Sequence, residues 1–298
     1  PDQSDHPTAA QDFAKLAEAY ELIRDESSAS DTNDAADADG VVPAASSAIR
    51  VFLNVEQSFE RAMASDAPAP RRLRRLQDAD LDGKVVLVRV DHNCVRRGSL
   101  TDAFRVDATV ATLYNIVERG GRPILMTHVG RPYDKKANRI DVDEGAAVVA
   151  AARYLQLRLG VTFAVPEFRA DTEKGISDID TSVNWLIDDL RARRIGGVYL
   201  PNARWFAGEE GKFGADASSR FAEQLAGLAD VFVNDAFGSW QPHVSTLGVT
   251  KMLPSYAGLL MQKELKALNA LLRPTRPFLA VIAGAKLDTK IGTVKAVA

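Results

Sequence analysis

The sequence predicts an α/β fold: a Rossmann-like doubly wound parallel sheet with helices on both faces, followed by an interdomain helix and the first strand–helix of a second α/β domain. Two observations predict it. Short continuous apolar runs alternate along the chain with segments of helical periodicity. Four of these runs also break off abruptly into polar side chains. Continuous apolar runs are typical of parallel strands buried on both faces, and strand–helix alternation implies right-handed crossovers.

The first predicted strand is the run VVLVRV at residues 85–90, which leads into Asp91, His92 and Asn93. Three later runs end in the same way: residues 124–126 lead into THVGRP, 198–200 into PNAR and 231–233 into NDAFG. Open α/β sheets bind ligands in the crevice beyond the carboxyl ends of their strands. We therefore expect the four strand exits to meet at one rim and to form a binding site there.

Apolar residues at helical spacing predict helices over residues 106–117, 146–159, 183–190 and 221–228, which lie between the predicted strands. A long helix with an apolar stripe is predicted over 255–272 and is closed by Pro274. After it come an apolar strand at 278–282, a turn at Gly284 and a helix start that carries Lys286 and Lys290. A single strand and helix cannot bury their own apolar faces, so this unit reads as the opening of a second domain.

The first 70 residues differ from the rest in net charge and in composition. They hold 14 acidic and 4 basic residues, whereas residues 71–298 have a net charge of +7. Residues 25–47, rich in Asp, Ala and Ser, predict a mobile tether. The amphipathic stretches 13–23 and 51–63 on either side predict short helices that dock on the body, on a partner or on each other, the body being the favoured choice. The basic run 71–75 is interpreted as a solvated helix face, with no nucleic-acid partner.

Composition indicates a globular protein, because 46% of the 298 residues are hydrophobic and 26% are charged. The basic body suits an anionic ligand, although so small an excess of charge is also ordinary for a protein surface. Cys94 is the one cysteine, so the chain forms no internal disulfide, which fits a reducing compartment. No apolar run approaches the roughly 20 residues that span a bilayer. We expect a cytoplasmic protein with no membrane contact, and an organellar matrix stays open.

Four motifs, in this order, carry a family resemblance: LVRVD with Asn93, THVGRP, NDAFG, and PFLA leading to Gly284-Ala285-Lys286. From about Asp78 onward the sequence resembles the phosphoglycerate kinases. Each motif alone is unspecific, whereas the ordered set is specific. The resemblance implies four parts: an acidic, partly disordered extension with short amphipathic helices (1–76), a phosphoglycerate-binding α/β domain (77–254), an interdomain helix (255–275) and the start of a nucleotide-binding domain (276–298).

The resemblance also implies site residues. The 3-phosphoglycerate site would be lined by Asp91, Asn93, Arg105, His128, Arg131 and Arg204. Arg105 has a second, catalytic role, in which it bridges the attacking carboxylate and the moving phosphoryl group. Lys286 would neutralise that group in flight, and Lys290 would bind nucleotide phosphates. The chemistry agrees, because arginine forks bind phosphate and carboxylate bidentately and phosphoryl transfer depends on positioned cations.

The implied ligands are 3-phosphoglycerate and 1,3-bisphosphoglycerate, together with ATP or ADP, which bring Mg²⁺ with them; no metal site of the protein itself is expected. Each site residue also has a structural interpretation. Asp91 resembles a turn cap, His128 a buried structural histidine, and Lys286 with Lys290 an exposed helix face. Arg89, inside the first strand, is predicted to be a structural ion-pair partner rather than a ligand group.

Three departures from the family pattern leave two functions open. His92, Cys94 and Val95 replace an aromatic residue and a Val-Pro pair. The stretch Ser239-Trp240-Gln241-Pro242-His243 is one residue shorter than its family counterpart and lacks an arginine, although His243 matches a family histidine. The glycine-rich nucleotide loops are absent. The chain is either part of a divergent phosphoglycerate kinase of glycolysis or carbon fixation, expected to be inactive alone, or an inactive binding subunit that docks on a protein partner through residues 1–70.

Overall fold

The computed structural model describes residues 73–239, 241–271, 275 and 278–279. The chain divides into two compact units, and the described part of the first runs from Leu73 to Glu264. This part holds the sheet and its helices. Residues 1–72 of the predicted extension, with its tether and its helices, lie outside the described residues, and so does the predicted helix start with Lys286 and Lys290.

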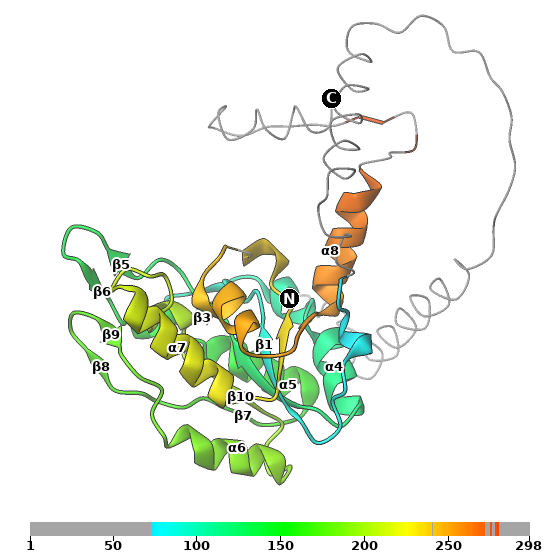
Figure 1. Ribbon diagram of the computed structural model, residues 1–298, viewed down its shortest axis with the longest axis horizontal. Coiled ribbons are helices and arrows are strands. Elements are labelled where there is room, and N and C mark those ends of the chain that lie inside the picture. Colours follow the sequence, from blue (N-terminus) through cyan, green and yellow to red (C-terminus); the bar gives the residue numbers. More distant parts are fainter. Residues whose placement is uncertain (1–72, 240, 272–274, 276–277, 280–298) are drawn as a thin grey trace, which may run out of the picture. The chain divides into compact units, whose positions relative to one another are not determined.

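The core of the first unit is a six-stranded sheet in which every neighbouring pair is parallel (Figure 1). The strands lie in the order β12-β11-β1-β4-β10-β7. Their bounds are β1 Val85–Arg89, β4 Arg122–Met126, β7 Phe163–Ala164, β10 Gly197–Tyr199, β11 Val231–Asn234 and β12 Ser255–Ala257. The predicted parallel sheet is confirmed, and the four runs noted in the sequence occupy its four central positions.

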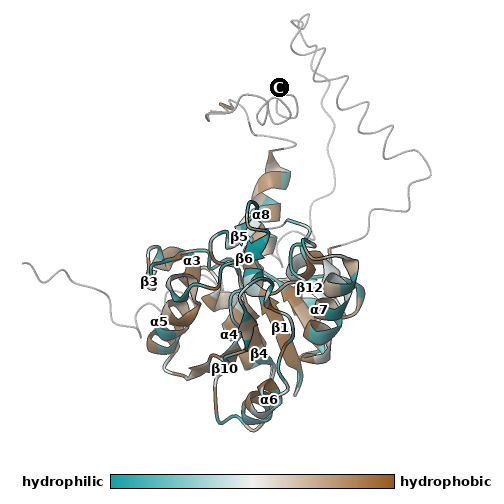
Figure 2. Cartoon of the chain, turned by 90° about the vertical axis from the view of Figure 1, so that its left-hand side faces the viewer, coloured by the Kyte–Doolittle hydropathy of each residue, from teal (hydrophilic) through white to brown (hydrophobic). Residues whose placement is uncertain are grey.

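Helices cover both faces of the sheet, as predicted. α3 (Ala103–Asp107), α4 (Val110–Glu118) and α5 (Val149–Leu159) pack on one face, and α6 (Val183–Arg191) and α7 (Ala215–Gly227) on the other (Figure 2). Alternate residues of β1 enter the two cores: Val86 and Val88 contact the first helix group, and Val85 and Leu87 the second. Since successive strand side chains point to opposite faces, a strand covered on both sides is apolar along most of its length.

Short elements lie at the edges of this framework. Three two-stranded hairpins join β2 (Val95–Arg96) to β3 (Ser99–Leu100), β5 (Tyr133–Asp134) to β6 (Arg139–Ile140), and β8 (Ala170–Asp171) to β9 (Gly175–Ile176). Single-turn helices are η1 Leu76–Asp78, η2 Glu144–Ala146, η3 Ala203–Trp205, η4 Phe237–Ser239, η5 Val244–Gly248 and η6 Val249–Lys251. η3, η4 and η5 follow β10 and β11 directly and therefore shape the rim beyond those strands.

Four predicted helices differ by more than one residue from those observed. α5 begins at Val149 and not at residue 146, and α7 begins at Ala215 and not at residue 221. The helix predicted over 106–117 is split into α3 and α4, because the Thr109 hydroxyl donates to the Val106 carbonyl and competes with the regular helical bond. The helix predicted from 255 begins at Leu259 as α8 (Leu259–Ala270), since Ser255–Ala257 forms strand β12 instead. Pairing with β11 outweighs the helical periodicity of these three residues.

The connections define where a ligand is expected. From β1 the chain passes to β4 on one side, whereas from β11 it passes to β12 on the other side. β1 and β11 are neighbours, so the strand order reverses between them, and such a reversal opens a crevice beyond the carboxyl ends of the two strands. Within the described residues no helix combines the length and the apolarity that crossing a bilayer requires.

Candidate functional site

Asp91, the first polar residue after β1, lies at this crevice and is almost completely buried. Its Oδ2 accepts a hydrogen bond from Nη2 of Arg105 at 2.6 Å, and its Oδ1 accepts one from Oγ of Ser239 at 2.6 Å. Ser239 belongs to the exit of β11, so this one carboxylate joins the two strands between which the sheet order reverses. A Cβ atom at Gly238 would lie 2.5 Å from Oδ2, which explains why a glycine precedes the serine.

Arg105 and Asn93 connect the exit of β1 to that of β4. Asp102 caps α3 by accepting from the Phe104 amide at 3.1 Å, and this places Arg105 in the last turn of the helix. Nη1 of Arg105 donates to the Asn93 carbonyl at 3.1 Å. The side-chain Oδ1 of Asn93 accepts from the Gly130 amide at 2.9 Å. The arginine is therefore positioned by a carboxylate and a backbone carbonyl, while its side chain stays about one-third exposed.

Asn202 fixes the exits of β4 and β10 against each other. Its amide group accepts from Val129 N at 2.9 Å and donates to Val129 O at 2.8 Å, so both backbone groups of one residue are bound. The same Oδ1 caps η3 by accepting from the Arg204 amide at 3.1 Å. Nη1 of Arg204 then donates to the Gly130 carbonyl at 2.6 Å.

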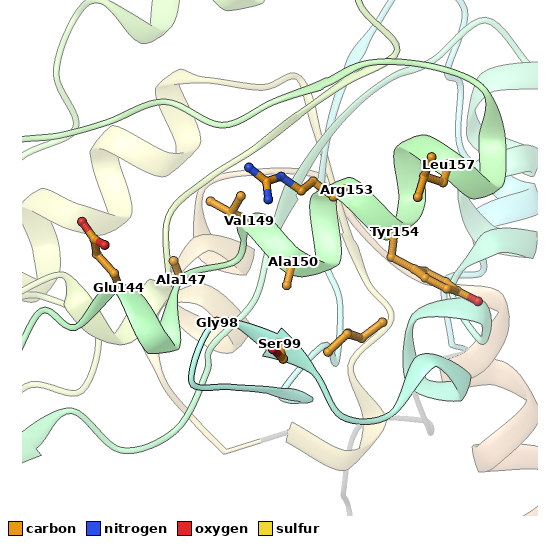
Figure 3. Close-up of a pocket in the computed structure, with 10 residues that line it drawn as sticks. Gly98, Ser99, Glu144, Ala147, Val149, Ala150, Arg153, Tyr154 and Leu157 are labelled. Carbon is orange, nitrogen blue, oxygen red and sulfur yellow. The ribbon is translucent and has the colours of Figure 1, made fainter.

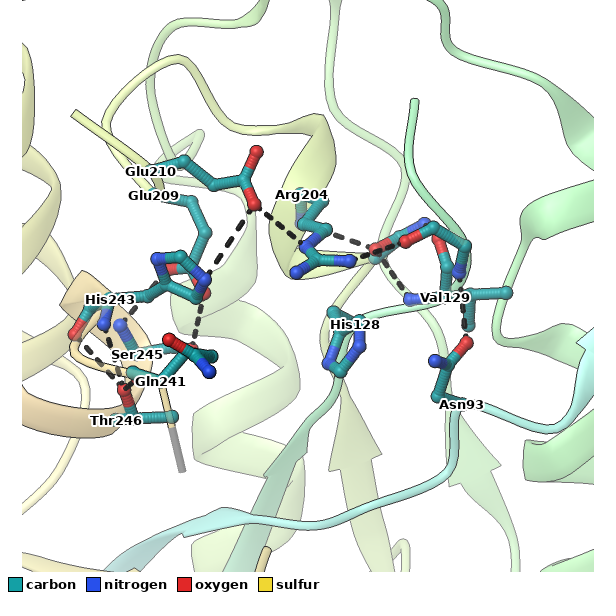
Figure 4. A network of polar contacts seen from close by, with 12 residues as sticks. Asn93, His128, Val129, Arg204, Glu209, Glu210, Gln241, His243, Ser245 and Thr246 are labelled. Carbon is teal, nitrogen blue, oxygen red and sulfur yellow. Dashed lines mark hydrogen bonds and ion pairs between the residues drawn. The ribbon is translucent and has the colours of Figure 1, made fainter. Parts of the chain in front are cut away.

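Arg204 also faces an acid. Its Nε lies 3.0 Å from Oε1 of Glu210, close enough for an ion pair although the angle does not suit a hydrogen bond. Oε1 of Glu210 is in turn 3.6 Å from Nε2 of His243 (Figure 4). The contacts thus continue from the exit of β10 to the segment after β11.

Arg131 differs from the other predicted site residues. It directly follows Gly130, is exposed, and forms no hydrogen bond or ion pair with the described residues. The remaining predicted rim residues lie in one connected region, whereas Arg131 is a free cation on the loop that this region anchors. Lys286 and Lys290 lie outside the described residues. Arg96 and Arg97, which could replace the missing family arginine, are both exposed on the β2–β3 hairpin.

His128 is buried beside Arg89. Arg89 is fully buried within β1, and its Nη2 donates to Nδ1 of His128 at 2.8 Å. Nε of Arg89 donates to Oγ of Ser245 at 3.0 Å, and Ser245 Oγ lies 2.5 Å from Oε1 of the buried Glu209. Burial lowers the pKa of His128 to about 2, and the nearby arginines act in the same direction. Burial also raises the pKa of Glu209, against the effect of Arg89.

This geometry agrees with the prediction that Arg89 is structural. It does not agree with the predicted direct ion pair, because no acid of the described residues contacts Arg89 directly. Among the described residues Arg89 meets its balancing acid through a serine hydroxyl. Sequence reasoning missed Glu209, Ser245, Ser239 and Asn202. The available signal was that a strand buried on both faces contained an arginine, because such a charge requires a buried acid elsewhere in the chain.

The departures at His92 and Cys94 are structural in character. His92 is fully buried, and its two ring nitrogens lie 2.8 Å from the Tyr199 hydroxyl and 3.0 Å from the Thr109 hydroxyl. Burial lowers the pKa of His92 to about 3 and raises that of the Cys94 thiol to about 11. A neutral, fully paired imidazole fills a core position, so neither residue adds charge to the rim.

Asp235, at the exit of β11, supports α8 instead of the rim. Its Oδ1 accepts from the amides of Leu260 and Met261 at 2.9 and 3.2 Å, in the first turn of that helix. Oδ2 is buried and has no hydrogen-bond partner among the described residues. Burial raises the pKa of Asp235 to about 7, although these amides and the Thr112 hydroxyl lower it.

A second hollow, with a volume of about 360 Å³, lies between the β2–β3 hairpin and α5 (Figure 3). Leu100, Val149 and Leu157 contribute to its largely apolar wall, and Arg153 is the one cation among its lining residues. Convergent cations and buried polar contacts occur at the rim of the sheet and not in this hollow. The rim is therefore the candidate binding site.

The chain is similar to known proteins over about three quarters of its length. The family model for phosphoglycerate kinase matches residues 76–298. Curated phosphoglycerate kinases from Azorhizobium caulinodans and Synechococcus sp. (strain CC9311) are 41% and 40% identical to the chain over 221 and 234 residues, which are 73% and 76% of this chain. The chain spans about half the length of these relatives, 50% and 52%.

Solved structures give the same fold. The phosphoglycerate kinase from Pyrococcus horikoshii OT3 superimposes with a TM-score of 0.58 at 24% identity, covering 75% of this chain and 52% of that one. The phosphoglycerate kinase from Coxiella burnetii gives a TM-score of 0.55 at 25% identity, over 74% of this chain and 50% of that one. With a family model that matches about three quarters of its residues, the chain belongs to the phosphoglycerate kinase family.

Proposed function

We propose that this chain carries the 3-phosphoglycerate half of an enzyme that transfers a phosphoryl group reversibly between ATP and 3-phosphoglycerate. One observation supports the proposal above the others. Cations from the exits of β4 and β10 and from α3 lie around the crevice where the strand order reverses, and hydrogen bonds join the segments that carry them. A small ligand with a phosphate and a carboxylate matches such a rim.

In this proposal Arg131 and Arg204 bind the phosphate and the carboxylate of the ligand. Asp91 and Asn93 accept from its hydroxyl, because a carboxylate that already accepts two hydrogen bonds retains further lone pairs. Arg105 acts catalytically by holding the attacking carboxylate oxygen against the incoming phosphoryl group. Its pairing with Asp91 orients the guanidinium and leaves part of the side chain open to the ligand.

The same proposal includes the nucleotide, ATP or ADP, and its Mg²⁺. Lys290 would bind the nucleotide phosphates, and Lys286 would neutralise the phosphoryl group during transfer. The described rim suits anions, since cations surround it and its buried carboxylate, Asp91, is paired with Arg105. Bound Mg²⁺ would neutralise charge on the nucleotide phosphates. We further propose the domain division 1–76, 77–254, 255–275 and 276–298, and a cytoplasmic enzyme of glycolysis or carbon fixation that also binds 1,3-bisphosphoglycerate.

Calorimetric titration with 3-phosphoglycerate tests the proposal. The chain should bind the ligand, and Arg204→Ala should weaken binding by about 1.5–3 kcal/mol, the usual loss for a charge-assisted hydrogen bond. Arg220→Ala is the matched control, because Arg220 is also ion-paired, to Asp178 at 2.5 Å, but lies on α7. Equal affinity of the two variants would remove Arg204 from the site.

A second candidate function is an inactive, binding-only relative. Two observations favour it: Arg204 is already neutralised by Glu210, and exposed Gln241 lies in the stretch where the family has an arginine. If 3-phosphoglycerate at millimolar concentration gives no heat and shifts no resonance of the chain, the substrate proposal fails and a structural role remains.

A further inference from the structure

Arg89 brings a permanent charge into the centre of the sheet, and each of its three side-chain nitrogens has an acceptor. Nη1 donates to the Val90 carbonyl at 2.7 Å and to the Thr127 hydroxyl at 3.3 Å. Nε and Nη2 donate to Ser245 and His128 as described above. A buried charge without such partners would cost several kcal/mol, so the identity of each acceptor is constrained.

The direction of each hydrogen bond follows from the donor inventory. A guanidinium only donates, so Nδ1 of His128 must accept. The proton of the neutral ring is therefore on Nε2, which forms no hydrogen bond with the described residues. By the same reasoning Ser245 Oγ accepts from Arg89, and its own hydrogen is donated to Oε1 of Glu209.

The surroundings of His128 oppose a second proton from every side. Arg89 on β1, Arg204 on η3, Arg105 on α3 and His243 at the start of η5 all lower its pKa. The buried acid Glu209 is hydrogen-bonded by Ser245 and balances the charge of Arg89. Figure 4 shows the His128 ring between Asn93 and the segment that carries His243, with Arg204 above it in this view.

We propose that Glu209, Ser245 and Arg89 form a positioning chain that fixes His128 as the neutral Nε2–H tautomer. His128 then offers a ligand a directional N–H donor without a charge, while the neighbouring arginines provide the charge. Arg89 and Ser245 act through His128 and do not contact the ligand. The identity of the ligand, 3-phosphoglycerate, rests on the proposed function. The tautomer of His128 does not depend on the ligand.

The tautomer can be measured directly in the ligand-free protein. Long-range ¹H–¹⁵N correlation spectra distinguish Nε2–H, Nδ1–H and doubly protonated rings, and His128→Gln assigns the resonance among the four histidines of the chain. We expect His128 to remain the Nε2–H form from pH 8 down to pH 5. An Nδ1–H ring, or protonation of His128 above pH 5, would overturn the proposal whatever the protein binds.

A substitution at Ser245 tests the part of the positioning chain that lies furthest from His128. Ser245→Ala removes the acceptor that holds Nε of Arg89, so Arg89 should lose its fixed position beside His128 and the His128 tautomers should mix. Binding of 3-phosphoglycerate should weaken about fivefold, the value of one neutral hydrogen bond. Ser218→Ala is the control, because its hydroxyl donates to the adjacent Gly208 carbonyl at 2.8 Å and lies outside the chain.

The His128 tautomer and the affinity for 3-phosphoglycerate, measured separately, distinguish this inference from the proposed function. If the ring is Nε2–H but 3-phosphoglycerate does not bind, the proposed substrate is wrong and the positioning chain stands. If Ser245→Ala folds and keeps the wild-type tautomer, Ser245 and Glu209 are not part of the chain. If Ser245→Ala does not fold, the spectrum of the wild-type protein alone decides the proposal.

Discussion

The Glu210 carboxylate lies 3.0 Å from Nε of Arg204, so the cation proposed to bind substrate is already paired with an acid of its own chain. Both side chains are largely buried, which leaves little solvent screening between them. An anionic ligand at Arg204 must compete with this carboxylate.

Glu210→Gln should therefore strengthen 3-phosphoglycerate binding about fivefold, since the ligand no longer competes with an ion pair that contributes on the order of 1 kcal/mol. Glu223→Gln, at an exposed position of α7, is the charge-matched control. Calorimetry at two salt concentrations measures both variants. A weaker affinity of the Glu210 variant would mean that the acid orients Arg204 for the ligand and does not compete with it.

Gly238→Ala should weaken substrate binding while the fold is retained. The added Cβ would lie 2.5 Å from Oδ2 of Asp91 and 3.6 Å from Nη2 of Arg105, so the two side chains must separate. Overpacking of this kind costs about 1–3 kcal/mol. Gly227→Ala, which meets no atom within 4 Å, is the matched control. Thermal unfolding and calorimetry should show lower stability and weaker substrate binding for Gly238→Ala. Both quantities should stay at the wild-type value for Gly227→Ala.

Asp235→Asn should remove part of the pH dependence of stability. Burial raises the pKa of this carboxyl from its usual value near 3.8 to about 7, so the native state holds a proton that the unfolded chain has lost between these values. As pH rises from about 4 to 7, Asp235 therefore lowers the free energy of unfolding of the wild-type protein by on the order of a few kcal/mol. Asparagine keeps an oxygen acceptor for the Leu260 and Met261 amides.

Urea unfolding at pH 5 and pH 8 measures this effect. The stability of Asp235→Asn relative to wild type should increase between the two pH values. Equal pH dependence of the two proteins would show that Asp235 is ionised in the native state at both. The buried His92 and His128 have the opposite sign, because their lowered pKa values destabilise the native state below about pH 6.5, so the comparison with wild type is needed to isolate Asp235.

Gln241→Arg restores a cation near the position where the family has one. Gln241 is exposed, and its backbone carbonyl accepts from the His243 amide at 2.7 Å, so the substitution leaves the local turn intact. Because Arg96 and Arg97 are exposed on the β2–β3 hairpin, we expect no existing substitute and a gain of about tenfold in 3-phosphoglycerate affinity. Unchanged affinity in the titration would indicate that another cation already fills this role.

The sequence predicted the central strands because each contains a continuous apolar run, which is typical of strands buried on both faces. It did not predict β7 and β12, which are two and three residues long. Neither has a recognisable period, and both form by pairing with β10 and β11. Short edge strands depend on tertiary contacts that local propensity does not contain.

The sequence predicted which residues follow the strands at the candidate rim, but it did not predict the hydrogen bonds between them. The strand exits identify Asp91, Asn93, His128 and Arg204, because these residues follow apolar runs directly. Ser245, the partner of Arg89, is 156 positions further along the chain and has no such signal. Only the folded sheet brings an ordinary serine and a glutamate to a buried arginine.

The pairing of β1 with β11 has a consequence for how the protein folds. Val85 and Asp230, which are hydrogen-bonded at 2.8 Å, are 145 positions apart, so closing this contact restricts a very long loop. Contacts between β1 and β4 can form much earlier, because only about one strand–helix unit separates them. Partly folded chains would therefore contain Asp91 and His128 on an ordered strand pair but no crevice. A ligand that needs both sides of the crevice binds only the complete sheet, and it would slow unfolding by stabilising the contact that forms last.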